Sequence, residues 1–341
     1  MGVTAYQTYN RAIYHGGDIS SAAAKFGGEI SNWIDLSTGI NPHSYPVPNL
    51  APRLWQQLPG TDVEDKLLDS ARSYYQAPNI FGAVAAPGTQ SLLQRLPECF
   101  AKSRVLILSP TYAEHKHCWQ AGGHTVVDVI DPTDKTTAVD ILVIVNPNNP
   151  TGQYFSKSEI ADLRRTFVKP DGLLVIDEAF MDLTPELSAL QSTPPKNTLI
   201  LKSFGKFFGL AGVRLGFAFG NAALTETLKQ KLGPWAVSGV ACEIGRHAYS
   251  NAAWIAPMRR QIQNEATRLS GLLAEHKIAV SGNAGLFLLT RNMASDELFN
   301  HLCQHHILTR PFADHPDFLR FGLPGNEADW ERLEAALNAR P

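Results

Sequence analysis

The chain has 341 residues, of which 44% are hydrophobic and 18% charged, and its formal net charge is -2 at pH 7. This composition is typical of a globular protein long enough for two domains, and it lacks the basic excess that would favour a nucleic-acid partner. The four cysteines are scattered and form no Cys-x-x-Cys pair, so neither a disulfide framework nor a zinc site is expected.

The first twenty residues lack the basic head and apolar run of a secretory signal. No apolar stretch approaches the length that a membrane span needs. We therefore expect a cytoplasmic protein without a membrane partner that acts on a small molecule.

The first half of the chain predicts an arm followed by a large α/β domain. Residues 1–51 are rich in Gly, Pro and Asn, which favours an arm and loops packed on a larger body. Most of the apolar runs that follow are continuous, as in strands buried on both faces, and helical patterns such as 91–100 and 156–166 lie between them. They predict a seven-stranded, mainly parallel sheet in a domain spanning residues 52–232, with strands at 83–85, 105–108, 125–130, 141–145, 173–176, 198–201 and 213–219.

The pattern changes after residue 220. Helices are expected over roughly 223–232 and 236–276. A short α+β region follows, made of segments 278–290, 295–306, 307–310 and 319–323 and a closing helix at 327–339. The sequence therefore predicts a smaller α+β domain over residues 233–341.

The most informative segment is residues 203–216, SFGKFFGLAGVRLG, which places Lys206 just after a buried strand, among glycines and aromatic residues. A desolvated lysine has a lowered pKa and is a competent nucleophile toward an aldehyde, and small neighbours let a planar cofactor approach closely. The alternative is an exposed lysine at a strand end.

This segment resembles the lysine signature of the class I and II aminotransferases, which depend on pyridoxal 5′-phosphate (PLP). The resemblance implies the aspartate aminotransferase type of fold, with Lys206 bound covalently to PLP. It also implies that Ser203 and Arg214 bind the cofactor phosphate, and that the active protein is a homodimer, because active sites of this fold lie between two subunits.

Asp177 ends another buried run, 173–176, where open α/β sheets bind their ligands. A carboxylate there can pair with the pyridinium nitrogen of PLP and keep the ring protonated, so that the ring can accept electrons from the substrate Cα. The alternative is a turn aspartate. Glu178 is expected to point the other way.

Three further segments fit the same family. Asn149, in the run NPNNPTG at 146–152, would donate to the ring oxygen of PLP, and a cis peptide is expected before Pro150. Gly88, Thr89 and Gln90 open a helix after the first strand, where backbone N–H groups can bind the cofactor phosphate. Tyr112 stands where the family stacks an aromatic ring on the cofactor, although a core aromatic is the alternative.

Segments outside this cofactor set resemble the threonine-phosphate decarboxylases of cobalamin biosynthesis, a branch of the family: HGGD at 15–18, LSTGINP at 36–42 and PWxV at 234–237. On that resemblance the substrate is a small phosphorylated amino acid. Arg320 would bind its carboxylate and Arg310 its phosphate or the same carboxylate, with His15 and Asn41 adding phosphate contacts. A histidinol-phosphate-type aminotransferase is the alternative reaction, and a silent PLP-binding or regulatory module is a third.

The chain departs from the family pattern at three positions. Leu58 replaces the tyrosine that reaches the neighbouring subunit's cofactor in many relatives, which puts that contact in doubt. Phe180 replaces a tyrosine near the ring oxygen, so Asn149 is the expected donor. Gly205 replaces a Ser or Thr, so one hydroxyl to the cofactor phosphate is expected to be absent.

Several conspicuous residues receive a structural interpretation. The histidine pairs at 115/117 and 305/306 have no carboxylate or thiol at ligand spacing, which favours helix-face or surface positions over a metal site. Trp119, Trp254 and Trp330 are interpreted as core or interface aromatics.

Overall fold

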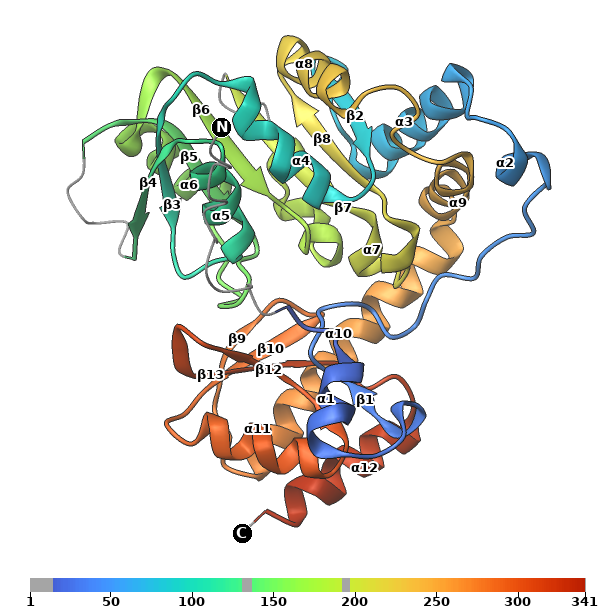
Figure 1. The fold of residues 1–341 in the computed structure, drawn as a ribbon, viewed down its shortest axis with the longest axis vertical. Helices are drawn as coiled ribbons and strands as arrows, with labels where there is room; N and C mark the ends of the chain where they lie inside the picture. The colour runs from blue at the N-terminus through green and yellow to red at the C-terminus, as the bar shows by residue number, and fades with distance from the viewer. Residues whose placement is uncertain (1–14, 131–136, 192–196, 341) are drawn as a thin grey trace, which may run out of the picture.

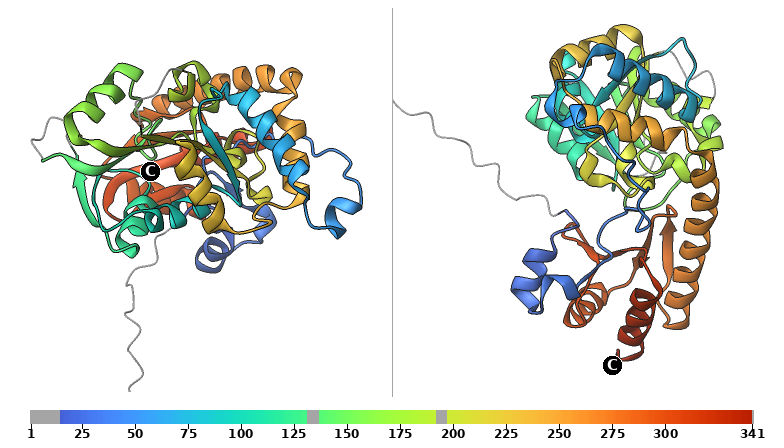
Figure 2. Two further views of the ribbon diagram at one scale, coloured as in Figure 1. Left: turned by 90° about the horizontal axis from the view of Figure 1, so that it is seen from above. Right: turned by 90° about the vertical axis from the view of Figure 1, so that its right-hand side faces the viewer.

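The computed structural model describes residues 15–130, 137–191 and 197–340. Figure 1 shows two bodies, an upper one built on the long sheet and a lower one built on a short sheet. One long helix, α10 (Ala252–Glu275), extends along the side of the molecule from the upper body to the lower one (Figure 2, right).

The upper sheet contains the seven strands that the sequence predicts. Their spatial order is β2-β8-β7-β6-β5-β3-β4. Strand β8 is antiparallel to both of its neighbours, whereas the other six strands share one direction, so the sheet is mainly parallel. The strands are β2 (Gly82–Ala86), β3 (Arg104–Leu108), β4 (Thr125–Val129), β5 (Val139–Val145), β6 (Val168–Asp177), β7 (Thr198–Ser203) and β8 (Gly216–Gly220).

The central strands separate two apolar cores. In β5, Leu142 and Ile144 belong to the core on one face, while Ile141 and Val143 belong to the core on the other. Successive side chains of a strand point to opposite faces, so a strand buried on both faces must be apolar throughout. Along the chain, the helices between these strands are α4 (Thr89–Arg95), α5 (Ala113–Ala121), α6 (Lys157–Phe167) and α7 (Phe204–Phe207).

The lower body carries an antiparallel sheet of order β12-β13-β10-β9. The helix predicted over 236–276 is interrupted, because Asn251 caps a new helix by accepting a hydrogen bond from the Trp254 amide. Before this body, the chain forms α8 (Ala222–Leu232), which packs on β2, and α9 (Gly239–Tyr249), both in the upper body (Figure 1). The elements of the lower body are β9 (Val280–Asn283), β10 (Phe287–Arg291), α11 (Ser295–Gln304), β11 (Ile307–Leu308), β12 (Arg310–Phe312), β13 (His315–Gly322) and α12 (Glu327–Asn338).

The described part of the N-terminal segment packs on the lower body. Strand β1 (Ile34–Asp35) pairs in parallel with β11, and α1 (Ile19–Phe26) lies beside α11 (Figure 1). The chain then rises through α2 (Arg53–Gln56) and α3 (Thr61–Tyr75) into the upper sheet. The domain limits at 51/52 and 232/233 stay predictions. None of the helices in the described residues is long and apolar enough to cross a membrane.

Candidate active site

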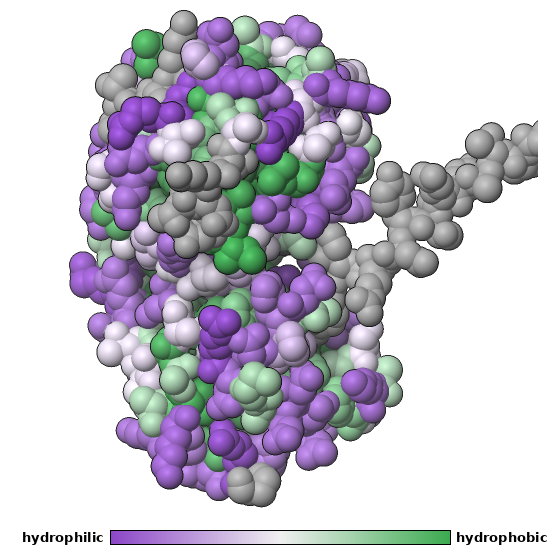
Figure 3. All heavy atoms as spheres, turned by 90° about the vertical axis from the view of Figure 1, so that its left-hand side faces the viewer, coloured by the Kyte–Doolittle hydropathy of each residue, from purple (hydrophilic) through white to green (hydrophobic). Residues whose placement is uncertain are grey.

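A cavity of 290 Å³ lies at the carboxyl ends of the parallel strands. The face in Figure 3 is mostly hydrophilic and is hollowed between the two bodies. Twelve residues proposed from the sequence line the cavity, although they come from distant parts of the chain: His15, Gly88, Thr89, Gln90, Tyr112, Asn149, Asp177, Ser203, Lys206, Arg214, Arg310 and Arg320.

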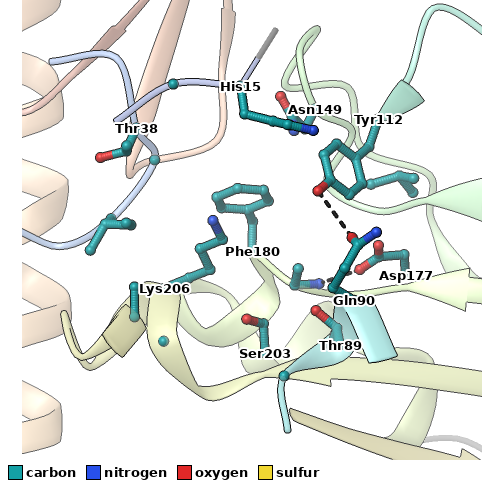
Figure 4. Close-up of a pocket in the computed structure, with 18 of the residues that line it drawn as sticks. His15, Thr38, Thr89, Gln90, Tyr112, Asn149, Asp177, Phe180, Ser203 and Lys206 are labelled. Carbon is teal, nitrogen blue, oxygen red and sulfur yellow. Dashed lines mark hydrogen bonds between the residues drawn. The ribbon is translucent and has the colours of Figure 1, made fainter. Parts of the chain in front are cut away.

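Lys206 lies in the short helix α7, directly after β7, and its amine faces the cavity (Figure 4). Burial, followed by the positive charges of Arg320 and Arg310, lowers the pKa of this amine from 10.5 to about 8. Asp177 opposes the shift with its negative charge. A larger fraction of Lys206 is therefore unprotonated near neutral pH than for an exposed lysine, as a nucleophilic amine requires.

Asp177 ends β6 and is held by two donors. Its Oδ1 accepts from the Ala179 amide at 3.0 Å, and its Oδ2 lies 3.0 Å from Nε2 of His115. Both side chains are buried. A carboxylate only accepts hydrogen bonds, so His115 must donate from Nε2, and this fixes the orientation of the Asp177 side chain.

The structural interpretation of the histidines was therefore incomplete. His117 and His305 are exposed and His306 is half-buried, but His115 is buried against Asp177. No local spacing could have found this contact, because His115 and Asp177 are 62 residues apart in the sequence. Within the described residues, no three His, Cys, Asp or Glu side chains form a group that could hold a metal ion.

Glu178 points away from the cavity, as the alternation along β6 predicts. Its carboxylate forms a buried ion pair with Lys202 and accepts hydrogen bonds from the Ser188 hydroxyl and the Ala189 amide. This cluster ties the ends of β6 and β7 together. It therefore supports the two strand ends that carry Asp177 and Lys206.

Asn149 and Arg320 both line the cavity and contact each other. Arg320 donates from Nη1 to Oδ1 of Asn149 at 2.6 Å and from Nη2 to the carbonyl of Ser37 at 2.7 Å. The Asn149 oxygen is thereby engaged, which leaves its amide nitrogen as the donor for a ligand. The Asn149–Pro150 peptide is cis, as expected.

Arg310 and Arg320 bring two positive charges to one cavity. Burial and, after it, the charge of Arg310 lower the pKa of Arg320. Like charges gathered in an enclosed space are costly unless an anion joins them, so this side of the cavity fits a ligand with negative groups.

Backbone packing forms a cradle beside Lys206. Gly88 has a φ of +79°, and a Cβ there would lie 2.5 Å from Nη2 of Arg214. At Gly216 a Cβ would lie 2.5 Å from the Thr89 amide nitrogen. The guanidinium and the first amides of α4 are thus held close together, with Ser203 on the same cavity wall (Figure 4), and this donor set fits a phosphate.

Asn41 does not line the cavity. Its side-chain amide donates to the carbonyl of Phe207 at 2.8 Å, and its oxygen accepts from the His43 amide at 2.9 Å. The side chain fastens a loop to the helix of Lys206. At Gly205, a Cβ would lie 2.8 Å from Cα of Ala211, so the close packing of α7 favours glycine there.

Comparison with known proteins decides the family. A family model described as "Aminotransferase class I and II" matches residues 32–337. This chain belongs to that family. It is 38% identical to the threonine-phosphate decarboxylase of Pseudomonas aeruginosa over 329 residues, covering 95% of this chain and 97% of the relative. A threonine-phosphate decarboxylase from a Sinorhizobium species has the same identity and coverage over 327 residues.

A solved structure confirms the predicted fold. The histidinol-phosphate aminotransferase of Sinorhizobium meliloti, determined in complex with pyridoxal-5′-phosphate, superimposes with a TM-score of 0.79. The match covers 98% of this chain and 97% of that one, at 15% sequence identity. At that identity the likeness concerns the fold alone.

Proposed function

We propose that this protein releases CO₂ from L-threonine O-3-phosphate and forms (R)-1-amino-2-propanol O-2-phosphate. The observation that carries the proposal is the 38% identity, over nearly the whole chain, to two threonine-phosphate decarboxylases. The cavity supports it, because two arginines face a space that also contains a lysine of lowered pKa. A substrate with both a carboxylate and a phosphate matches these charges.

The cofactor is PLP, and the residues of the cavity fit it. When bound, PLP supplies an electron sink for the bond that breaks at the substrate Cα. Asp177, oriented by His115, would hold a proton at the pyridine nitrogen. Asn149 would donate to the ring oxygen, and the cradle of Gly88 and Arg214 would bind the cofactor phosphate.

The residues of this chain would also orient the substrate. Arg320 and Arg310 would hold the substrate carboxylate and phosphate and so restrict the position of the Cα–carboxylate bond. Lys206, with its pKa of about 8, would donate the proton that replaces CO₂ at Cα.

The alternative is a histidinol-phosphate-type aminotransferase. Such an enzyme shares the fold, as the Sinorhizobium meliloti structure shows, so the fold does not separate the two reactions. The relatives with 38% identity favour decarboxylation.

The reaction is tested with purified holoenzyme and L-threonine O-3-phosphate, with and without 2-oxoglutarate. A decarboxylase needs no amino acceptor, so we expect catalytic CO₂ release in both mixtures. Unphosphorylated L-threonine should be a poor substrate, because it has no phosphate group to pair with the charged donors of the cavity. If histidinol phosphate and 2-oxoglutarate instead yield glutamate faster and without CO₂, the aminotransferase alternative is correct.

We also propose that the protein is a cytoplasmic homodimer acting in cobalamin biosynthesis. Trp55, Leu58 and Trp235 are large apolar side chains that are more than half exposed. Trp55 lies in α2, which packs against α9. Pro59, which follows Leu58, lines the same surface pocket as Trp235, so the three side chains lie in one region. Light scattering should give twice the chain mass of 37.3 kDa.

The lowered pKa of Lys206 predicts how PLP binding depends on pH. Only the unprotonated amine attacks an aldehyde, so the rate of PLP attachment to apoenzyme should rise with pH through a midpoint near 8 rather than 10.5. Stopped-flow absorbance of added PLP measures this rate. A midpoint above 10 would show that Lys206 behaves as an exposed lysine.

The Gly88→Ala variant tests the cradle. The new Cβ would displace the Arg214 guanidinium and force an L side chain into positive φ, which costs about 1–2 kcal/mol. We expect PLP to bind about tenfold more weakly. Gly27→Ala is the matched control, because Gly27 also has positive φ but no atom within 4 Å of its Cβ position. Equal PLP affinity in both variants would contradict the assignment of the cradle.

A further inference from the structure

The carboxylate of Glu114, in α5, joins two parts of the cavity wall. Its Oε1 lies 3.0 Å from Nε2 of His15, and its Oε2 accepts from Nε2 of Gln90 at 2.6 Å. Gln90 in turn accepts from the Tyr112 hydroxyl at 3.2 Å (Figure 4). Glu114 is buried and does not itself line the cavity, yet its partners His15 and Gln90 do, and so does Tyr112, the partner of Gln90.

The direction of these hydrogen bonds depends on Glu114. An ionised carboxylate only accepts, so both His15 and Gln90 must turn a nitrogen toward it. The Gln90 oxygen is then left to accept from Tyr112. Burial, followed by the charge of Glu114, raises the pKa of Tyr112 to about 12, so its hydroxyl keeps the proton that it donates. One carboxylate therefore fixes the orientation of three cavity side chains.

The segment that carries His15 is fastened at a second point. The Gly17 amide donates to the Ser37 hydroxyl at 2.7 Å. At Gly16 a Cβ would lie 2.3 Å from the Ser37 carbonyl oxygen, so only glycine permits this close approach. The backbone fixes where His15 stands, and Glu114 fixes which way its ring faces.

The side chain of His15 is more exposed to solvent than that of Glu114. Its side chain is 45% exposed, against 11% for Glu114. In Figure 4 it lies across the cavity from Lys206 and Phe180. A ligand held at Lys206 would therefore extend toward His15. Arg310 lines the same cavity and interacts electrostatically with Tyr112, next to which His15 lies, with ring centroids 6.1 Å apart.

We infer that Glu114 is a positioning residue that selects phosphorylated substrates by holding His15 in place to bind the substrate phosphate. The inference rests on the proposed function for the identity of that substrate. Glu114 touches neither the cofactor nor the substrate, and it acts through His15. The link to Gln90 and Tyr112 makes the same carboxylate a brace for the cofactor side of the cavity.

The test compares Glu114→Gln holoenzyme with the wild type in binding L-threonine O-3-phosphate and L-threonine. Stopped-flow absorbance of the bound PLP gives the apparent Kd of each ligand from the rapid phase, before any product forms. A glutamine cannot accept from both His15 and Gln90 in the same way, so His15 should lose its orientation. We expect binding of the phosphorylated ligand to weaken about tenfold, the scale of one charge-assisted hydrogen bond, and binding of L-threonine to change less than twofold.

Three variants complete the design. His15→Ala should show the same selective loss, and adding Glu114→Gln to it should cause no further loss of the preference for the phosphorylated ligand. Gly16→Ala displaces the segment of His15 without altering Glu114, so it tests the inference even if Glu114→Gln does not fold. Glu331→Gln, on the exposed side of α12, controls for the loss of one negative charge.

Equal weakening for both ligands, unchanged binding of the phosphorylated ligand, or additive losses of the preference for that ligand in the double variant would each overturn the inference. The proposed function fails separately. If the wild type binds L-threonine O-3-phosphate but evolves no CO₂, the reaction assignment is wrong, while the comparison of Kd values still decides the role of Glu114. If the wild type binds the phosphorylated ligand no better than L-threonine, the phosphate subsite itself is refuted.

Discussion

Replacing Lys206 by alanine is expected to leave a folded protein that no longer holds PLP covalently and has lost its activity by about 10³-fold or more. In the proposed function the lysine has two roles that no neighbour can take over: its amine would bind the cofactor aldehyde, and it would carry the proton for Cα. Its neighbours Arg310 and Arg320 carry guanidinium groups rather than an amine, and Phe180, whose ring centroid lies 5.6 Å from the amine, has no titratable group.

The measurement combines absorbance and peptide mapping. Wild-type protein should be yellow, and borohydride reduction should abolish the visible band and leave PLP attached to one peptide, the one that contains Lys206. Lys66→Ala, at an exposed position on α3, is the control and should retain the band. A label on a different lysine, or a visible band of normal intensity in the Lys206→Ala variant, would contradict the central assignment.

The large sheet was predictable because its strands are buried on both faces. Val143 and Leu142 pack into different cores, so neither position tolerates a polar side chain, and the apolar run marks the strand. The cofactor residues at the strand ends were predictable for a related reason. The motif SFGKFFGLAGVRLG contains glycines that close packing requires, at Gly205 and Gly216, together with a lysine and an arginine that packing alone does not explain.

The contacts between distant segments were not predictable. His115 and Asp177 are 62 residues apart, and Glu114 and His15 are 99 apart, so no local pattern links them. The same limit explains Asn41. Its motif resembles one that serves the substrate, but here the folded chain supplies the Phe207 carbonyl as a partner for its amide. Which side chains complete a site depends on the packing of the two bodies, which periodicity does not describe.

The Asp177→Asn variant is expected to bind PLP but to turn over at least about a hundredfold more slowly. The substitution keeps the size of the side chain and removes the charge that would hold the proton on the pyridine nitrogen. Without that proton the ring withdraws electrons from Cα less strongly, so the bond to the carboxylate breaks more slowly. The rate of CO₂ release at saturating L-threonine O-3-phosphate is the measurement, and Asp128→Asn, at a partly exposed ion pair with Lys116, is the matched control.

Replacing His115 by leucine should also slow turnover, but only about tenfold. This substitution removes one of the two hydrogen bonds that orient Asp177 and leaves the charge of the carboxylate in place. In the double variant the loss should be close to that of Asp177→Asn alone, because the hydrogen bond from His115 serves that carboxylate. The visible spectrum of the bound cofactor should shift in the same order, as both changes alter the protonation of one ring. Near wild-type turnover in Asp177→Asn would mean that another group holds the ring proton, and a His115 loss that adds fully to that of Asp177→Asn would mean that His115 acts on its own.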